Sequence, residues 1–153
     1  MKNGFTLVEL LATIVIISII TLIGTVGISV ARKGIYQSMW NTNVELIEAA
    51  AANFGSDKKA YIENLTDSCE VDQSSKVPCL TIPVQTLIDR GYLNSKNYIS
   101  YNDDDKYKVI VNKTIEKSAE EDDNFQNGYY VNNYKVAIYI ENNIVYAKYL
   151  NTA

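Results

Sequence analysis

Few residue types in this chain could carry out chemistry. Histidine is absent from the 153 residues, so the usual general base at neutral pH and the commonest zinc ligand are both missing. The two cysteines, Cys69 and Cys79, lie ten positions apart, a spacing that fits neither a CxxC redox pair nor the paired knuckles of a zinc site. From this spacing alone they are either disulfide-bonded or two free thiols. Motifs for hydrolases, nucleotide binding and zinc proteases are also absent, so we expect neither enzyme activity nor a cofactor.

The acidic residues are the remaining candidates for binding a cation. The chain has 18 Asp and Glu against 14 Lys and Arg, a net charge of −4, which disfavours a protein that coats nucleic acid. Calcium binds clusters of side-chain oxygens in loops, but neither acidic cluster here has the spacing of an EF-hand. We interpret both clusters as solvated loops, with calcium binding as the alternative. They are Asp103-Asp104-Asp105 and Glu120-Glu121-Asp122-Asp123-Asn124.

The elements that would position these residues divide the chain into two parts, of which the first is strongly apolar. No residue between Glu9 and Arg32 is charged. As a helix, the 22 residues from Leu10 to Ala31 would be about 33 Å long, enough to cross the hydrocarbon layer of a membrane. A secretory signal peptide would have a shorter apolar region. The sequence therefore predicts a membrane-spanning helix.

Glu9 stands directly before this apolar run. A carboxylate inside the hydrocarbon layer costs several kcal/mol, so such a residue either has a charged partner or reaches back to the lipid headgroups. Because Glu9 lies near the edge of the predicted span, the residues alone favour the second interpretation.

The segment around Glu9 suggests a different role. Gly4 is followed by Phe5-Thr6-Leu7-Val8-Glu9-Leu10 and then by the apolar run, which resembles the precursors of the type IV pilin family. The resemblance covers residues 4–31. It implies that a prepilin peptidase cuts between Gly4 and Phe5 and that the new Phe5 amine is methylated. It also implies that Glu9 pairs with the Phe5 amine of a neighbouring subunit as the filament assembles.

This resemblance implies a location and a set of partners. The precursor would be a single-pass membrane protein, and the mature subunit would join a helical filament of identical copies on the cell surface. Its other partners would be the peptidase that also methylates it and an inner-membrane assembly platform. Residues 1–4 would be a leader, 5–34 the transmembrane and filament-core helix, and 35–153 an extracellular head. In such an exported head, a Cys69–Cys79 disulfide is expected.

Helical periodicity continues beyond the apolar run. A stripe at spacings of three and four residues predicts an amphipathic helix, and Gly55 stands at a plausible C′ position. One helix would then run from about Thr6 to Phe54. The stripe consists of Tyr36, Trp40, Val44, Ile47, Ala51 and Phe54.

The rest of the head is predicted to be short helices followed by strands. Ser56-Asp57 can cap a short helix carrying Tyr61, Ile62 and Leu65, and a polar loop should cover Thr66 to Val77. A second helix from about Pro83 to Arg90 would have Thr81 as its N-cap and Gly91 as its terminator. From Tyr98 onward the hydrophobic period becomes two, with Asn142-Asn143 as a hairpin turn. We expect an α+β fold, in which an antiparallel sheet of three to four strands packs on Trp40, Val44 and Ile47.

The favoured function is therefore a structural subunit of a type IV pilus or pilus-like filament. One alternative is a pseudopilin of a type II secretion or DNA-uptake machine. Another is a membrane-anchored binding module that never polymerises. The 12 tyrosines either fill the small sheet or form an adhesive patch.

Overall fold

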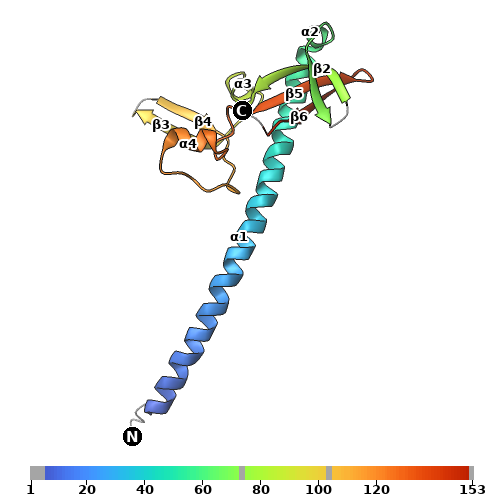
Figure 1. The fold of residues 1–153 in the computed structure, drawn as a ribbon. Coiled ribbons are helices and arrows are strands. Elements are labelled where there is room, and N and C mark those ends of the chain that lie inside the picture. Colours follow the sequence, from blue (N-terminus) through green and yellow to red (C-terminus); the bar gives the residue numbers. More distant parts are fainter. Residues whose placement is uncertain (1–5, 73–74, 103–104, 152–153) are drawn as a thin grey trace.

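A computed structural model describes residues 6–72, 75–102 and 105–151, without the side chains of 23–27, 70–72, 75–76, 98, 100–102 and 105. One long helix carries a head at its C-terminal end, and the N-terminus lies at the opposite end of the helix (Figure 1). The expected α+β arrangement, a long N-terminal helix packed on a small antiparallel sheet, is confirmed.

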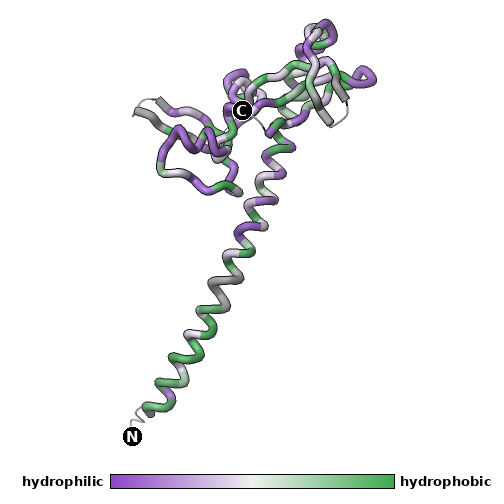
Figure 2. Tube along the Cα trace, viewed as in Figure 1, coloured by the Kyte–Doolittle hydropathy of each residue, from purple (hydrophilic) through white to green (hydrophobic). Residues whose placement is uncertain are grey.

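The long helix, α1, spans Leu7–Asp57, 51 residues and about 76 Å. Its first half is predominantly apolar and its second half is mixed, as Figure 2 shows. The predicted stripe is confirmed, because every side chain along it from Tyr36 to Phe54 is buried or half-buried. Trp40 packs edge-on against Tyr149, with ring centroids 5.7 Å apart.

The predicted end of this helix is wrong. Gly55 was expected just beyond the helix, but α1 continues through it to Asp57, with Lys58 as the C-cap. A Cβ on Gly55 would overlap Cγ2 of Ile138 and lie 2.8 Å from Cγ1 of Val145. Glycine is therefore needed here because the sheet approaches the helix closely, and not because the backbone turns.

The head is built on a four-stranded antiparallel sheet in the order β1-β2-β5-β6. Its strands are β1 (Ser68–Asp72), β2 (Ser75–Pro83), β5 (Lys135–Glu141) and β6 (Ile144–Tyr149). The predicted turn between β5 and β6 is confirmed, with Asn142 and Asn143 at φ of 49° and 66°. These values fit a two-residue hairpin turn, in which both central residues have positive φ.

Helix α1 lies across β6 and β5. The main-chain N–H of Tyr149 donates a hydrogen bond of 2.9 Å to Glu48 Oε1, which ties β6 to the helix. The larger apolar core of the described residues forms between the helix and the sheet. Its most deeply buried members are Ile47, Ala51, Ile62, Val84, Leu87, Val131, Val136 and Ile138.

The short helices differ in detail from the predictions. Helix α2 spans Lys59–Ile62, and Lys58 precedes it without a side-chain cap. Ser56, expected as part of that cap, lies inside α1 and donates its hydroxyl to the Ala52 carbonyl at 2.9 Å. Helix α3 spans Val84–Asp89 and has Pro83 as its N-cap.

Two further predictions around α3 have opposite outcomes. Thr81 is not a cap, since it lies in β2 opposite Ala137. Gly91 ends the helix as expected, with φ of +80°. The prediction of a cap at Thr81 failed because β2 continues directly into α3 without a loop.

The predicted polar loop at 66–77 is also wrong, because most of it forms β1 and the start of β2. The two strands pair from Ser68 opposite Pro78 to Asp72 opposite Ser75. Few of the residues from 66 to 77 are apolar, so the alternation of apolar and polar residues that marks a strand is hard to recognise there.

The strands expected from Tyr98 onward do not all join one sheet. Strands β3 (Asn97–Asn102) and β4 (Asp105–Val109) form a separate two-stranded hairpin. Helix α4 (Glu121–Gln126) lies beside it (Figure 1). A second small core of Ile99, Val109 and Tyr130 holds this part together.

Candidate functional site

The start of α1 is organised by a reciprocal pair of hydrogen-bonding residues. Thr6 has an extended conformation and caps the helix, and its hydroxyl accepts a hydrogen bond of 3.3 Å from the Glu9 main-chain N–H. In return, Glu9 Oε2 accepts hydrogen bonds of 2.9 Å from the Thr6 main-chain N–H and from the Thr6 hydroxyl. This is a capping box, which supplies partners to main-chain donors that the first turn leaves unpaired.

The capping box turns the Glu9 carboxylate back toward the beginning of the chain. Gly4 and Phe5, the residues of the predicted cleavage and methylation, lie outside the described residues. The cap itself could have been recognised from the sequence, since Thr6 and Glu9 stand at the Thr-x-x-Glu spacing of this motif. Thr6 is thus a residue of the site that the sequence analysis did not single out.

The apolar side chains of the first part of α1 are exposed in this single chain. Leu7 is 80% exposed and Leu22 is 71% exposed, and Val8 falls between them. Among the described residues, no helix combines the length and the apolar character required to cross a membrane. These apolar residues lie on the part of the helix that stands away from the head (Figure 2).

The predicted disulfide between Cys69 and Cys79 is present, with the two Cα atoms 5.9 Å apart. It joins β1 to β2 at one edge of the sheet. Beside it, the Cys79 main-chain N–H donates a hydrogen bond of 3.0 Å to the Asp67 carbonyl. Closing a loop of this size stabilises a fold by about 3 kcal/mol in the chain-entropy model.

The two acidic clusters do not form a metal centre among the described residues, where no group of three or more candidate ligands gathers. Asp103 and Asp104 lie outside those residues, and Asp105 begins β4. The second cluster was expected to be a loop but lies mainly on α4. Asn124 of that cluster is buried, and its Oδ1 accepts a hydrogen bond of 2.6 Å from the Ser118 main-chain N–H. The role of Asn124 is therefore to hold the chain before α4 in place.

The tyrosines are divided between the core and the surface. Tyr130 is buried, whereas Tyr61, Tyr107 and Tyr146 are exposed on three different elements. The exposed rings do not come from one strand or helix. In the described structure, some tyrosine side chains therefore pack in the core and others lie at separate points on the surface.

Two tyrosines have perturbed acidity for different reasons. The Tyr92 hydroxyl donates a hydrogen bond of 2.5 Å to Asp57 Oδ2, and this bond raises the pKa of Tyr92 above its ordinary value. Burial raises the pKa of Tyr149, with Tyr134 as a second cause. The Tyr149 hydroxyl has no hydrogen-bond partner among the described residues. Tyr149 is thus a neutral packing residue between the helix and the sheet.

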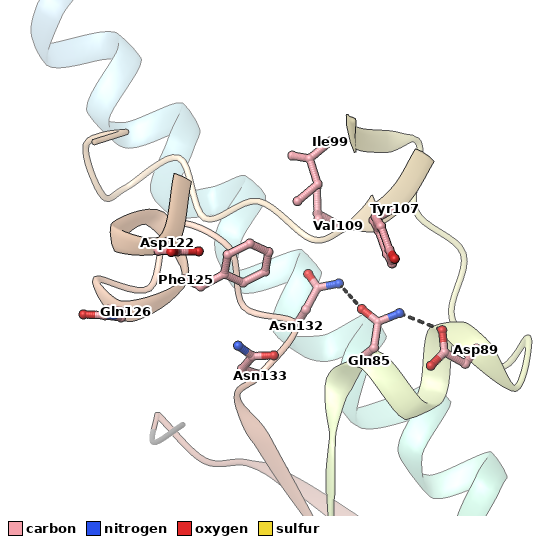
Figure 3. A pocket seen from close by; sticks show the side chains of 10 residues that line it. All are labelled: Gln85, Asp89, Ile99, Tyr107, Val109, Asp122, Phe125, Gln126, Asn132 and Asn133. Atoms are coloured by element: carbon pink, nitrogen blue, oxygen red, sulfur yellow. Dashed lines mark hydrogen bonds between the residues drawn. The ribbon is translucent and has the colours of Figure 1, made fainter. Parts of the chain in front are cut away.

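The head also contains a cavity of about 540 Å³ that the sequence analysis missed. It lies between α3, the β3–β4 hairpin and α4 (Figure 3). The lining residues come from four separate segments of the chain, so no local motif could reveal them. They are Gln85, Asp89, Ile99, Tyr107, Val109, Asp122, Phe125, Gln126, Asn132 and Asn133.

Comparison with known proteins bears on the start of α1. Residues 1–25 match the family model of the prokaryotic N-terminal methylation motif. No curated protein and no solved structure matches the chain. The matched segment contains the predicted cleavage site, the capping box and the beginning of the apolar helix. The chain therefore carries a type IV prepilin-like N-terminal signal in front of a pilin-like α+β head.

Proposed function

We propose that this protein is a structural subunit of a type IV pilus or pilus-like surface filament. It is made as a membrane-inserted precursor, cut after Gly4, methylated at Phe5 and polymerised through α1. The observation that carries this proposal is the methylation motif at residues 1–25, which leads directly into a helix with exposed apolar side chains.

The conformation at Thr6 supports processing at the Gly4–Phe5 bond, one residue earlier. Thr6 has φ of −76° and ψ of 151°, and the first helical residue is Leu7. A peptidase binds its substrate in an extended conformation, and the capping box keeps the helix from beginning earlier. Glycine at position 4 also lets the enzyme approach the backbone closely.

The exposed apolar residues of α1 supply the driving force for assembly. Burying one Leu, Ile or Val side chain contributes about 1.5–3 kcal/mol. Many such residues between Leu7 and Leu22 are more than half exposed in the single chain. Either a lipid bilayer or a bundle of neighbouring α1 helices would cover them, so the same surface serves the precursor and the filament.

Glu9 supplies the register of that bundle. In an apolar surrounding, its carboxylate needs a positive partner, and the methylated Phe5 amine of the next subunit has the required charge. The capping box already directs the carboxylate toward the start of the helix, where such an amine would arrive.

Shearing of the native cells tests the proposal. We expect long filaments in the sheared fraction, containing this protein and detectable with an antibody against the head. A Gly4→Leu variant should remain uncut in the membrane and give no filaments, because a bulky side chain blocks the approach of the peptidase.

The two alternatives give different results in the same experiment. A pseudopilin would be cleaved normally but would be scarce outside the cell. An anchored binding module would stay in the membrane fraction with its Met1 start intact. Either of these results, or normal processing of Gly4→Leu, would overturn the proposal.

A further inference from the structure

The cavity in the head has the dimensions of a small-molecule site. Its volume of about 540 Å³ falls within the range of about 300–1,000 Å³ that such sites occupy. It is formed by the part of the head that lies beside the four-stranded sheet, and it shares no residue with the capping box at the start of α1. Filament assembly through α1 gives no role to this cavity.

The inner surface of the cavity is apolar and aromatic. Ile99 and Val109 are buried beneath it, at 8% and 1% exposure. The rings of Phe125, from α4, and Tyr107, from β4, flank the opening from opposite sides (Figure 3). Phe125 is held against Tyr130, with ring centroids 5.0 Å apart. Aromatic side chains therefore lie on both sides of the opening, and the Phe125 ring is half-buried against the second core.

A chain of hydrogen bonds fixes one carboxylate at the cavity. Asn132 Nδ2 donates to Gln85 Oε1 at 2.5 Å, and Gln85 Nε2 donates to Asp89 Oδ1 at 2.6 Å (Figure 3). Asn132 is 2% exposed, and its amide also bonds the main chain of Lys108 and Ile110. The buried end of the chain thus orients the carboxylate at its outer end.

This arrangement limits what the cavity can recognise. The Asn132 and Gln85 side chains already bond each other and their neighbours, so neither has its full set of donors and acceptors for a ligand. The cavity is therefore poorly suited to binding a sugar, because a sugar needs several free donors and acceptors. The groups best placed to meet a ligand are the Phe125 ring and the Asp122 carboxylate, which both belong to α4.

The charge of the lining has one sign. Among the described lining residues, Asp89 and Asp122 are acidic and none is Lys or Arg. Lys108, which follows Tyr107 in β4, donates to Asn94 Oδ1 at 3.3 Å. Successive side chains of a strand point to opposite faces, which places Lys108 on the other side of the hairpin. An anionic ligand would be repelled here, whereas carboxylates beside aromatic faces attract an ammonium group.

We propose that this cavity binds an organic cation, an ammonium group carried on a small apolar stem. The stem lies on Ile99 and Val109, the ring of Phe125 contacts the cation, and Asp122 of the same helix balances its charge. The ammonium group belongs either to a free small molecule or to a lysine side chain of a partner protein.

Ligand-observed NMR on the full chain in detergent tests this binding. The first probe is choline, and its control is dimethylbutanol, in which a carbon atom replaces the charged nitrogen. We expect saturation transfer to choline and at least fivefold weaker binding of the neutral isostere, because the cation–π and ionic attractions are lost, at roughly 1 kcal/mol or more in total.

Neighbouring residues of α4 provide matched variants. Asp122→Asn should weaken choline binding about threefold, as expected for loss of one partly exposed ion pair. Asp123→Asn makes the same change of charge one residue further along, outside the lining, and should leave binding unchanged. Phe125→Leu keeps an apolar side chain but removes the ring, and should weaken binding about fivefold.

Two short peptides distinguish the source of the ammonium group. One carries a single lysine, and the other carries norleucine, which has the stem without the charge. Binding of choline alone would indicate a free small molecule, and binding of the lysine peptide would indicate a partner protein. Both results support the shared chemistry. Equal binding of dimethylbutanol and choline, equal effects of Asp122→Asn and Asp123→Asn, or binding of no cationic probe would overturn the proposal.

Discussion

At the N-terminal end of α1, Glu9 accepts hydrogen bonds from the main chain and the hydroxyl of Thr6. A glutamine at this position can make the same cap, because the capping box uses Glu or Gln. Pairing with the Phe5 amine of a neighbouring subunit, by contrast, requires the negative charge. The observed cap and the proposed pairing can therefore be separated by substitution.

We predict that Glu9→Gln and Glu9→Ala both lower the yield of filaments about tenfold or more, while precursor insertion stays normal. The reason is that an unpaired amine in an apolar contact costs several kcal/mol. Quantitative immunoblotting of sheared and membrane fractions gives the measurement. Normal filaments from Glu9→Gln, with a defect in Glu9→Ala alone, would show that the cap matters and the charge does not.

Tyr149 is a second residue whose chemistry can be tested. Its hydroxyl is buried and without a partner among the described residues, a state that costs about 1–3 kcal/mol. We predict that Tyr149→Phe raises the free energy of unfolding by about 1 kcal/mol, measured by thermal melting. Tyr146→Phe, an exposed position on the same strand, should change nothing. A less stable Tyr149→Phe variant would contradict this assignment.

The raised pKa of Tyr149 also has a consequence at high pH. The folded protein holds the Tyr149 proton more tightly than the unfolded chain, whose pKa is near 10.0. The contribution of the Tyr149 proton to the free energy of unfolding is therefore fully present below pH 10, and it is lost as the pH rises above 10. The Tyr149→Phe variant should lose stability less steeply in this range.

Between elements, two glycines of α1 differ in how closely the sheet approaches them. A Cβ on Gly55 would meet Ile138 and Val145, whereas a Cβ on Gly34 would meet nothing within 4 Å. Alanine normally stabilises a helix interior by about 1 kcal/mol relative to glycine. Replacing glycine with alanine should therefore lower the stability at position 55 but not at position 34 of the same helix.

We predict that Gly55→Ala destabilises the head by about 1–3 kcal/mol, the usual cost of overpacking a core. Melting followed by the fluorescence of Trp40, which lies on the stripe against Tyr149, reports this loss. Gly34→Ala is the matched control and should not lower the midpoint. A Gly55→Ala protein as stable as the parent would show that the sheet can move away from the helix without cost.

The disulfide joins two strands at the edge of the sheet, so its loss should act locally as well as globally. We predict that reduction lowers the free energy of unfolding by about 3 kcal/mol. Hydrogen exchange should become faster in β1 before it does in β5 and β6. The Cys69→Ala/Cys79→Ala protein is the control, because reductant should not change it further. Identical melting of the oxidised and reduced protein would contradict a stabilising role.

How far the sequence predicts these elements depends on how regular their patterns are. The stripe of α1 and the Asn142-Asn143 hairpin were predictable, because their periods and turn residues are clear. Strand β1 was not, since most of its residues are polar. The split into two sheets depends on long-range packing that no local pattern encodes.

The candidate sites divide in the same way. The segment from Gly4 to Glu9 is continuous, so its resemblance to a known signal was visible in the sequence. The cavity is assembled from segments as far apart as Gln85 and Asn133. Its residues have no shared spacing and become a group only when α3, α4 and the hairpin come together.

At the scale of the whole molecule, the chain places two kinds of surface at opposite ends. The first part of α1 presents exposed apolar side chains. The head at the other end of the helix mixes hydrophilic and hydrophobic residues (Figure 2) and contains the cavity between α3, α4 and the hairpin. A helix about 76 Å long separates the N-terminus from the far end of the head. In a filament, this arrangement would put the apolar helices at the centre and the heads outside.

The most direct test is the intact mass, under non-reducing conditions, of the protein sheared from its native cells. We predict the mass of residues 5–153 with one added methyl group and two hydrogens fewer than the reduced chain. This single value reports cleavage after Gly4, methylation of Phe5, export and the Cys69–Cys79 disulfide together. A chain that still begins at Met1 and is recovered from the membrane fraction alone would contradict the account.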